Sequence, residues 1–259
     1  MYLVAVYILA GVLGLCVGSF LNVVIYRVPA GIGLAKPNSH CPACKYELRW
    51  YDNIPVLSYL LLGGKCRSCK ARISPRYVAV ELANAALWLL CVLFWWEQSI
   101  ALACIYALIF SVFLCVLCID VAQKVIYDRF QVILLLLSVA SVFFDQDYGW
   151  LSHVIGGAVG FVFFYLVSLA FERVAGEEGL GGGDIKLALV AGILLGWQRL
   201  LLALLVATLP AAVIMSIRKR GAQGEERQFP FAPFLIVGFT VAMFFGTQIV
   251  RWYLSLFGL

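Results

Sequence analysis

The chain has 259 residues, of which 64% are hydrophobic and only 13% are charged, and its mean hydropathy is +0.98. A water-soluble domain of this size cannot bury so much apolar surface, so the composition excludes an ordinary soluble globular protein and indicates a polytopic membrane protein. The formal net charge is +5. We expect the basic surface to contact the lipid bilayer and no nucleic acid. We also expect no cleavable signal peptide, since the first apolar segment lacks a small-residue cleavage site.

Eight apolar segments follow one another along the chain, and most reach the ~17–25 residues that cross a bilayer as a helix. They lie near residues 3–25, 78–96, 100–119, 130–144, 151–171, 185–197, 200–217 and 231–250. The segments at 130–144 and 185–197 are shorter than the others. The pattern predicts an all-α polytopic membrane protein with about eight transmembrane helices.

Basic residues predict the orientation of these helices. All Lys and Arg residues except Arg199 and Arg251 fall in four segments that share one side of the membrane if every span crosses. Those segments are 26–77, 120–129, 172–186 and 218–228. Basic loops stay on the cytoplasmic side, so this side is predicted to be cytoplasmic, with both termini outside. If the span at 185–197 failed to cross, the basic residues at 218–220 would lie outside, so we expect it to cross.

The one sizeable segment outside the predicted spans, residues 26–77, carries four of the nine cysteines in two Cys-x-x-Cys pairs. These are Cys41, Cys44, Cys66 and Cys69. Two such pairs supply four thiolates to a tetrahedral ion, and the reducing cytoplasm disfavours disulfides. We expect a structural zinc ion, because four sulfur ligands leave no open position. A redox-active thiol set is the alternative to a metal, and His40 is an alternative ligand.

The sequence therefore divides into three parts: a first transmembrane helix at 1–25, a small cytoplasmic zinc lobe at 26–77 between the first and second helices, and a seven-helix membrane domain at 78–259. The five remaining cysteines lie in apolar segments, and we expect them to be small buried side chains. They are Cys16, Cys91, Cys104, Cys115 and Cys118.

Two aspartates lie at cytoplasmic ends of predicted spans. Asp120 ends the third span, and Asp184 opens the sixth directly after three glycines at 181–183. Acids at membrane depth are costly and are usually functional. Two carboxyls that share one proton hydrolyse a peptide bond when the ionised one activates water and the protonated one donates to the scissile carbonyl. We predict Asp120 and Asp184 as this pair; helix capping or contact with headgroup water is the alternative for each.

The two predicted helix ends differ in polarity. A helix N-terminus favours an anion and a C-terminus does not, so we assign Asp184 as the base and Asp120 as the initial acid. Because coupled carboxyls titrate jointly, the two roles belong to the pair.

Several segments resemble the prepilin peptidases, the bifunctional type IV leader peptidases of the GxGD aspartyl protease class. The resemblance covers nearly the whole chain. It rests on residues 18–29 (Gly-Ser-Phe-Leu-Asn-Val-Val-Ile-Tyr-Arg-Val-Pro), both cysteine pairs, 50–55 (Trp-Tyr-Asp-Asn-Ile-Pro), 73–77 with Glu81, 119–120, the Gly-x-Gly-Asp-x-Lys at 181–186, and 230–234.

The resemblance implies two reactions at the cytoplasmic face of the bacterial inner membrane. The first removes the basic leader of type IV prepilins and type II pseudopilins after a glycine. The second methylates the new amino terminus with S-adenosylmethionine. The resemblance also implies that Asp120 and Asp184 carry the protease and that the two cysteine pairs bind zinc.

Two features leave residue assignments open. Tyr127-Asp128 stands where the family often has Pro-Asp and is similar to the presenilin-like branch, so Asp128 remains an alternative catalytic acid. No glycine-rich nucleoside fingerprint marks a methyl-donor site. Asn22, Arg27 and Glu81 are polar residues between the lobe and the membrane and are candidates for that site, with structural contacts between helices as the alternative.

Other functions also remain open. Acidic residues on the predicted cytoplasmic loops could bind the basic leader, or could be solvated loop charges: Asp128, Glu172, Glu177 and Glu178. A signal-peptide-peptidase-type intramembrane protease would not explain the four-cysteine lobe. A non-enzymatic transporter or scaffold would use the aspartates as a cation site. The sequence does not fix which pilins are cut or the oligomeric state.

Overall fold

The computed structural model describes residues 2–175, 181–218, 230–256 and 258. Within these ranges the chain forms eight α-helices and one short 3-10 helix, with isolated bridges in place of β-strands. The all-α prediction is therefore confirmed. The chain divides into two compact units, Met1–Cys115 and Val116–Leu259, each described by itself below.

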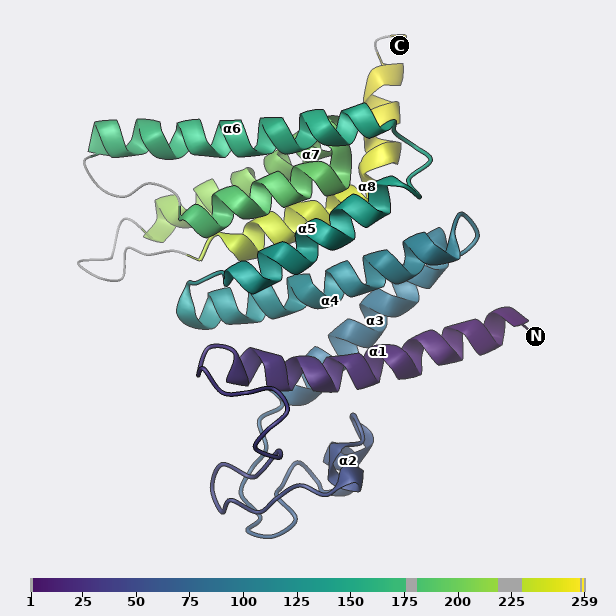
Figure 1. The fold of residues 1–259 in the computed structure, drawn as a ribbon, viewed down its shortest axis with the longest axis vertical. Coiled ribbons are helices and arrows are strands. Elements are labelled where there is room, and N and C mark those ends of the chain that lie inside the picture. The colour runs from purple at the N-terminus through teal and green to yellow at the C-terminus, as the bar shows by residue number, and fades with distance from the viewer. Residues whose placement is uncertain (1, 176–180, 219–229, 257, 259) are drawn as a thin grey trace. The chain divides into compact units, whose positions relative to one another are not determined.

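In the first unit, α1 (Tyr2–Arg27) packs along α3 (Arg76–Trp95), as Figure 1 shows. The two backbones approach closely at two glycines of α1. A Cβ atom at Gly14 would lie 2.8 Å from the Cα of Ala85, and one at Gly18 would lie 2.8 Å from the Cα of Glu81. Small residues permit this kind of packing between membrane helices.

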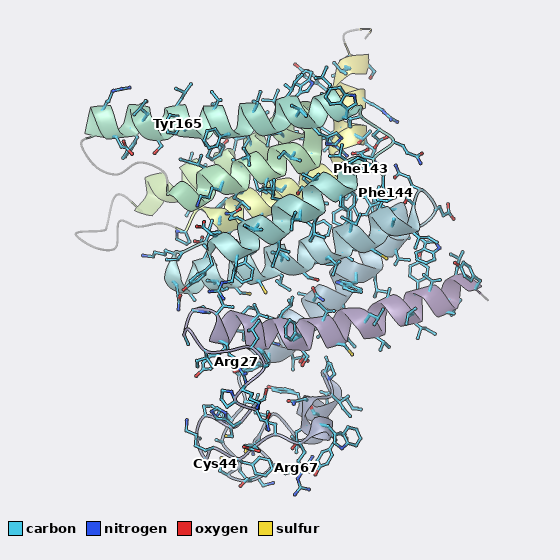
Figure 2. The ribbon with its side chains drawn as sticks, in the orientation of Figure 1. Arg27, Cys44, Arg67, Phe143, Phe144 and Tyr165 are labelled. Carbon is cyan, nitrogen blue, oxygen red and sulfur yellow. The ribbon has the colours of Figure 1, made fainter. Side chains whose placement is uncertain are left out.

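The cysteine lobe joins α1 to α3 and contains η1 (Trp50–Asn53) and α2 (Leu57–Leu61). Figure 1 shows it beyond the adjoining ends of these two helices, and Figure 2 labels Cys44 and Arg67 within it and Arg27 at the end of α1. The first unit ends within α4 (Ile100–Gln123).

The second unit contains the last turns of α4 and four further helices that lie side by side in Figure 1. These helices are α5 (Asp128–Val142), α6 (Trp150–Ala175), α7 (Gly182–Arg218) and α8 (Ala232–Ser255). α6 and α7 meet across glycines, since a Cβ atom at Gly192 would lie 2.1 Å from the carbonyl oxygen of Gly156.

α7 is interrupted at Gly196, whose φ of 73° and ψ of 164° are not helical. A Cβ atom at Gly160 would lie 2.4 Å from the Ala188 oxygen and 3.4 Å from the Leu200 side chain. An unbroken helix would place positions 188 and 200 about 18 Å apart. The chain therefore folds back at Gly196, and the two parts of α7 are the two spans predicted at 185–197 and 200–217.

Each predicted span agrees with one of these helices to within two residues at its ends or lies inside it, and α7 contains two spans. Six helices are long and apolar enough to cross a membrane by length and composition: α1, α3, α4, α6, α7 and α8. With 15 residues, α5 reaches only about 22 Å at 1.5 Å per residue, which is less than the ~30 Å hydrocarbon core.

Two exceptions to the cytoplasmic charge pattern, Arg199 and Arg251, share one end of the second unit. Arg199 pairs with Asp145, and Arg251 with Asp147 at 3.2 Å. Both aspartates lie in the segment between the fourth and fifth predicted spans, which the charge count also places outside.

The expectation that all five remaining cysteines are buried is wrong for two of them. Cys91 and Cys115 are buried and Cys118 is half-buried, but Cys16 and Cys104 are exposed on apolar helices. An apolar membrane helix exposes small residues where it faces lipid instead of protein, so an apolar neighbourhood alone does not predict burial within the chain.

Candidate active site

Four helix ends lie at one end of the second unit (Figure 1), and two of these helices carry the predicted acids. They are the C-terminal end of α4 and the N-terminal ends of α5, α7 and α8. Asp120 lies in the last turn of α4 and is 5% exposed. Its carboxylate accepts a hydrogen bond from the backbone N–H of Ala232, the first residue of α8.

Asp184 is the third residue of α7, at the helix start where the sequence predicted it. Its N–H donates to the Gly181 carbonyl at 2.9 Å, which closes the glycine turn. A side chain at Gly183 would lie 3.0 Å from Ile126, so the turn packs closely against the segment before α5. The Asp184 carboxylate is near enough to that of Asp120 to interact with it electrostatically. The structure therefore brings the two acids together.

Each of the two carboxyl groups has one buried oxygen with no hydrogen-bond partner in the part of the chain that the structure describes. These atoms are Asp120 Oδ2 and Asp184 Oδ1. Unpaired buried acceptors are costly and are rare in folded proteins. A pair of them at one site suits a group that brings its own donors, such as a water molecule held between two carboxyls.

Asp128, the alternative acid, has a different environment. It opens α5, its side chain is 73% exposed, and it forms an ion pair with Lys186 at 2.6 Å. Among the other acids considered for leader binding, Glu172 is exposed near the end of α6. Glu177 and Glu178 lie outside the described residues.

The sequence reasoning missed two neighbours of the acids. One is the Ala232 N–H, whose proximity to Asp120 no local pattern encodes. The other is Gln131, which donates from Nε2 to the Gly183 carbonyl at 2.9 Å. A polar residue near the start of the short apolar span at 130–144 was the available signal for Gln131.

The four predicted metal ligands form one cluster in the first unit, with their sulfur atoms all within 4.8 Å of one another. The Sγ atoms of Cys41 and Cys69 are 3.9 Å apart, and those of Cys44 and Cys66 are also 3.9 Å apart. A tetrahedral zinc ion with 2.3 Å bonds separates its sulfurs by about 3.8 Å. The cluster therefore fits a zinc ion, and it is too open for disulfides.

The two cysteine turns share one backbone design. Lys45 donates its N–H to the Cys41 carbonyl at 2.9 Å, and Lys70 donates to the Cys66 carbonyl at 3.1 Å. Both lysines take positive φ values, 60° and 59°. His40, the alternative ligand, has its ring Nδ1 3.1 Å from the Asn38 carbonyl.

An ion pair connects η1 to the second cysteine turn. Arg67 donates from Nε to Asp52 at 2.8 Å, and the Asp52 side chain is 1% exposed. This hydrogen bond raises the pKa of the Arg67 guanidinium. Asp52 also accepts from the Arg49 N–H at 3.2 Å. The lobe is thus held by a buried acid as well as by its cysteines.

The three candidates for a methyl-donor site are all buried and already hydrogen-bonded. Asn22 donates to the Tyr77 carbonyl at 3.0 Å. Arg27 donates to two carbonyls in the segment after α1, those of residues 33 and 34. Glu81 accepts from the Val56 N–H at 2.8 Å.

Val56 is a strained neighbour of Glu81. Its φ of 60° and ψ of −49° are rare for any residue with a β-branched side chain. Backbone strain of this kind is often found at functional sites.

The fold and the site define a polytopic α-helical membrane protein with a pair of buried aspartates at one end of its helices. Residues 12–95 match the family model described as the bacterial peptidase A24 N-terminal domain, and residues 107–216 match the type IV leader peptidase family. The chain belongs to the type IV leader peptidase family. Together with the six apolar helices, this membership indicates a multi-pass inner-membrane protein.

Curated relatives match along almost their whole length. The chain is 35% identical to the prepilin leader peptidase/N-methyltransferase of Pseudomonas aeruginosa, over 95% of this chain and 92% of that protein. It is 34% identical to the protein of that name from Stutzerimonas stutzeri, over 94% and 92%, and 34% identical to that from Dichelobacter nodosus, over 92% and 91%. No solved structure is a significant match.

Proposed function

We propose that this chain is a bifunctional membrane enzyme that cleaves the leader peptide from prepilins and then N-methylates the new amino terminus. The family and the names of the curated relatives support both activities. The observation that carries the peptidase is the meeting of Asp120 and Asp184, each with a buried oxygen that lacks a hydrogen-bond partner among the described residues.

In this proposal the two aspartates act as an acid–base pair. One carboxylate removes a proton from the attacking water, and the other, protonated, donates to the carbonyl oxygen of the scissile bond. Asp184 is the base, because it lies in the first turn of α7 where the helix dipole favours the anion, and Asp120 is the acid, because it lies in the last turn of α4.

Aspartate-to-asparagine variants test the peptidase. Asp120→Asn and Asp184→Asn should each lower the rate of prepilin cleavage by roughly 10³-fold or more, since a pair that shares one proton fails when either member is lost. The matched control is Asp128→Asn, whose exposed side chain should leave kcat largely unchanged. Cleaved substrate would be quantified by mass spectrometry. Wild-type rates in both pair variants would remove Asp120 and Asp184 from catalysis. Loss of activity in Asp128→Asn and Asp184→Asn, with a wild-type rate in Asp120→Asn, would favour the presenilin-like arrangement.

The proposed organisation assigns one role to each part of the chain. Residues 1–25 form the first transmembrane helix, 26–77 form a zinc lobe at the cytoplasmic face, and 78–259 carry the protease. The charge pattern supports the cytoplasmic orientation of the lobe and of the two acids. Zinc is structural in this scheme, because the four thiolates fill a tetrahedron and leave no open position.

For methylation, we place the candidate site near Glu81. Its buried carboxylate could hold a cationic group, and both the new amino terminus and S-adenosylmethionine carry one. The methyl donor supplies the transferred methyl group. The strained turn at Val56 supports this placement over a purely structural role for Glu81. Asn22 and Arg27 are weaker candidates, because both are used to hold backbone carbonyls.

Separating the two activities tests this placement. Glu81→Gln should abolish transfer from labelled S-adenosylmethionine to a pre-cleaved pilin while leaving leader cleavage intact. The control is Glu47→Gln, an exposed acid of the cysteine lobe. Loss of both activities together with a lower melting temperature would mean that Glu81 has a structural role.

Recognition of the basic leader by acidic loop residues remains part of the proposal. Reversing Glu177 and Glu178 to lysine should raise the KM for prepilin, because like charges then repel the leader. Glu172→Lys is a variant at a described, exposed position. Unchanged kinetics in all three would remove these residues from leader binding.

A further inference from the structure

Gln131 is a buried polar side chain that contacts the backbone turn before Asp184, and its amide nitrogen is already hydrogen-bonded there. It lies in the first turn of α5 and is 5% exposed. Its Nε2 donates to the Gly183 carbonyl at 2.9 Å, across 52 residues of sequence. Gly183 directly precedes Asp184, so this bond joins α5 to the backbone of the catalytic turn.

The hydrogen bond to Gly183 fixes the direction of the Gln131 amide. Reversing the amide would place two acceptors, Oε1 and the Gly183 carbonyl, against each other. Oε1 therefore has a defined position and is an acceptor only. It is buried and has no hydrogen-bond partner in the described segments of the chain.

The unpartnered Gln131 oxygen lies near the backbone of the turn that carries Asp184. From the 2.9 Å bond and the lengths of the two amide bonds, Oε1 lies at most about 5.5 Å from the Gly183 carbonyl oxygen. Asp120 Oδ2 and Asp184 Oδ1 are likewise buried and have no hydrogen-bond partner among the described residues. Three helices thus each bring one buried acceptor without a donor to this end of the second unit.

A peptide substrate supplies the missing donor. A water molecule between the carboxyls and the scissile carbonyl satisfies the acids themselves, but it leaves the amide hydrogens of the extended substrate unpaired. Every peptide bond except one preceding proline carries such a hydrogen, whatever its side chains. An amide oxygen fixed at the catalytic turn could therefore position a main chain without reading its sequence.

We propose that Gln131 is a substrate-binding residue whose Oε1 accepts a hydrogen bond from a backbone N–H of the substrate close to the scissile bond. This inference rests on the proposed peptidase function. It assigns Gln131 two contacts: Nε2 holds the catalytic turn, and Oε1 holds the peptide that the turn cleaves.

Ester substitution in the substrate gives a direct test. A prepilin-derived peptide is made in which each amide near the cleavage site, except the scissile one, is replaced in turn by an ester, which removes the N–H. Values of kcat/KM are measured for the wild type and for Gln131→Met, which has similar length and no amide. Gln131→Met should lower kcat/KM about 10- to 100-fold with the all-amide peptide.

The decisive result is the coupling between the two changes. At one position, the ester should lower kcat/KM of the wild type about 10-fold or more. The same ester should change kcat/KM of Gln131→Met little, because that variant has already lost the acceptor oxygen. Gln123→Met makes the same change at an exposed glutamine at the end of α4 and should behave as the wild type.

Additive losses at every ester position would overturn the proposal and would assign Oε1 to a bound water. If Gln131→Met melts at a much lower temperature, the ester series is measured again with Gln131→Asn. This variant withdraws the amide oxygen by one bond of about 1.5 Å. Failure of the peptidase proposal is distinguishable, because it would appear as wild-type cleavage in Asp120→Asn and Asp184→Asn.

Discussion

Asp120, in the last turn of α4, accepts a hydrogen bond from the backbone N–H of Ala232 at the start of α8. This bond orients one oxygen of the carboxyl and leaves the other buried and unpaired among the described residues. The acid is therefore held firmly in place while half of it is left without a partner. Such an arrangement favours function at the expense of stability.

The first prediction follows from this conflict. Asp120→Asn and Asp184→Asn should raise the free energy of unfolding by about 1 kcal/mol, equivalent to about 2–4 °C in melting temperature, while abolishing cleavage. An asparagine at position 120 can still accept a hydrogen bond from the Ala232 N–H. In either variant, the asparagine NH₂ can donate toward the carboxylate that remains. Scanning fluorimetry in detergent would measure the change.

Asp128→Asn is the control for this experiment. The Asp128 side chain is exposed, so its substitution should change stability by no more than about 0.5 kcal/mol. A lower melting temperature in both pair variants would contradict the idea that the two acids are a source of strain.

The second prediction concerns the metal. Cys66→Ser removes a buried ligand, so the purified variant should lose the bound zinc expected at one ion per chain, and the lobe at 26–77 should be cut rapidly by added protease. Cys104→Ser, at an exposed cysteine of α4, should retain the ion and the protease resistance. Zinc would be counted by mass spectrometry of the metal. Full zinc content in Cys66→Ser would rule out the four-thiolate site.

Local sequence patterns predicted the helices and the cysteine cluster, but they did not predict the contacts between helices that are distant in sequence. The Cys-x-x-Cys spacing fixes two sulfurs in one turn, and the charge count required the span at 185–197 to cross, which agrees with the reversal at Gly196. The contacts of Gln131 with Gly183 and of Asp120 with Ala232 join separate helices. No periodicity encodes which helix ends become neighbours, because packing of the whole unit decides it.

A third prediction tests the close approach of α6 and α7. Gly156→Ala would place a methyl group 2.4 Å from the Gly192 carbonyl oxygen, and the obstacle is backbone that cannot move alone. We expect a loss of about 1–3 kcal/mol of unfolding free energy. Gly11→Ala, where the nearest atom is a side-chain carbon at 3.8 Å, should be neutral or stabilising. Equal melting temperatures for the two variants would contradict the packing.

The last prediction compares two ion pairs at the end of the second unit that carries Arg199 and Arg251. In one, Asp145 and Arg199 have side chains that are 3% and 5% exposed, and Arg199 also donates to the Leu195 carbonyl at 2.6 Å. In the other, Asp147 and Arg251 are 33% and 72% exposed. Removing one partner of a buried pair leaves an uncompensated charge, whereas an exposed pair is screened by solvent.

Asp145→Asn should therefore lower the free energy of unfolding by about 3 kcal/mol or more, and Asp147→Asn by less than about 1 kcal/mol. Adding Arg199→Gln to Asp145→Asn should cost less than the sum of the two single changes, because the charge left unpaired is removed with it. Thermal unfolding in one detergent is measured for the three single variants, Asp145→Asn, Asp147→Asn and Arg199→Gln, and for the double variant. Equal losses for Asp145→Asn and Asp147→Asn would mean that water reaches the inner pair, and burial would then not explain the stability of this end of the unit.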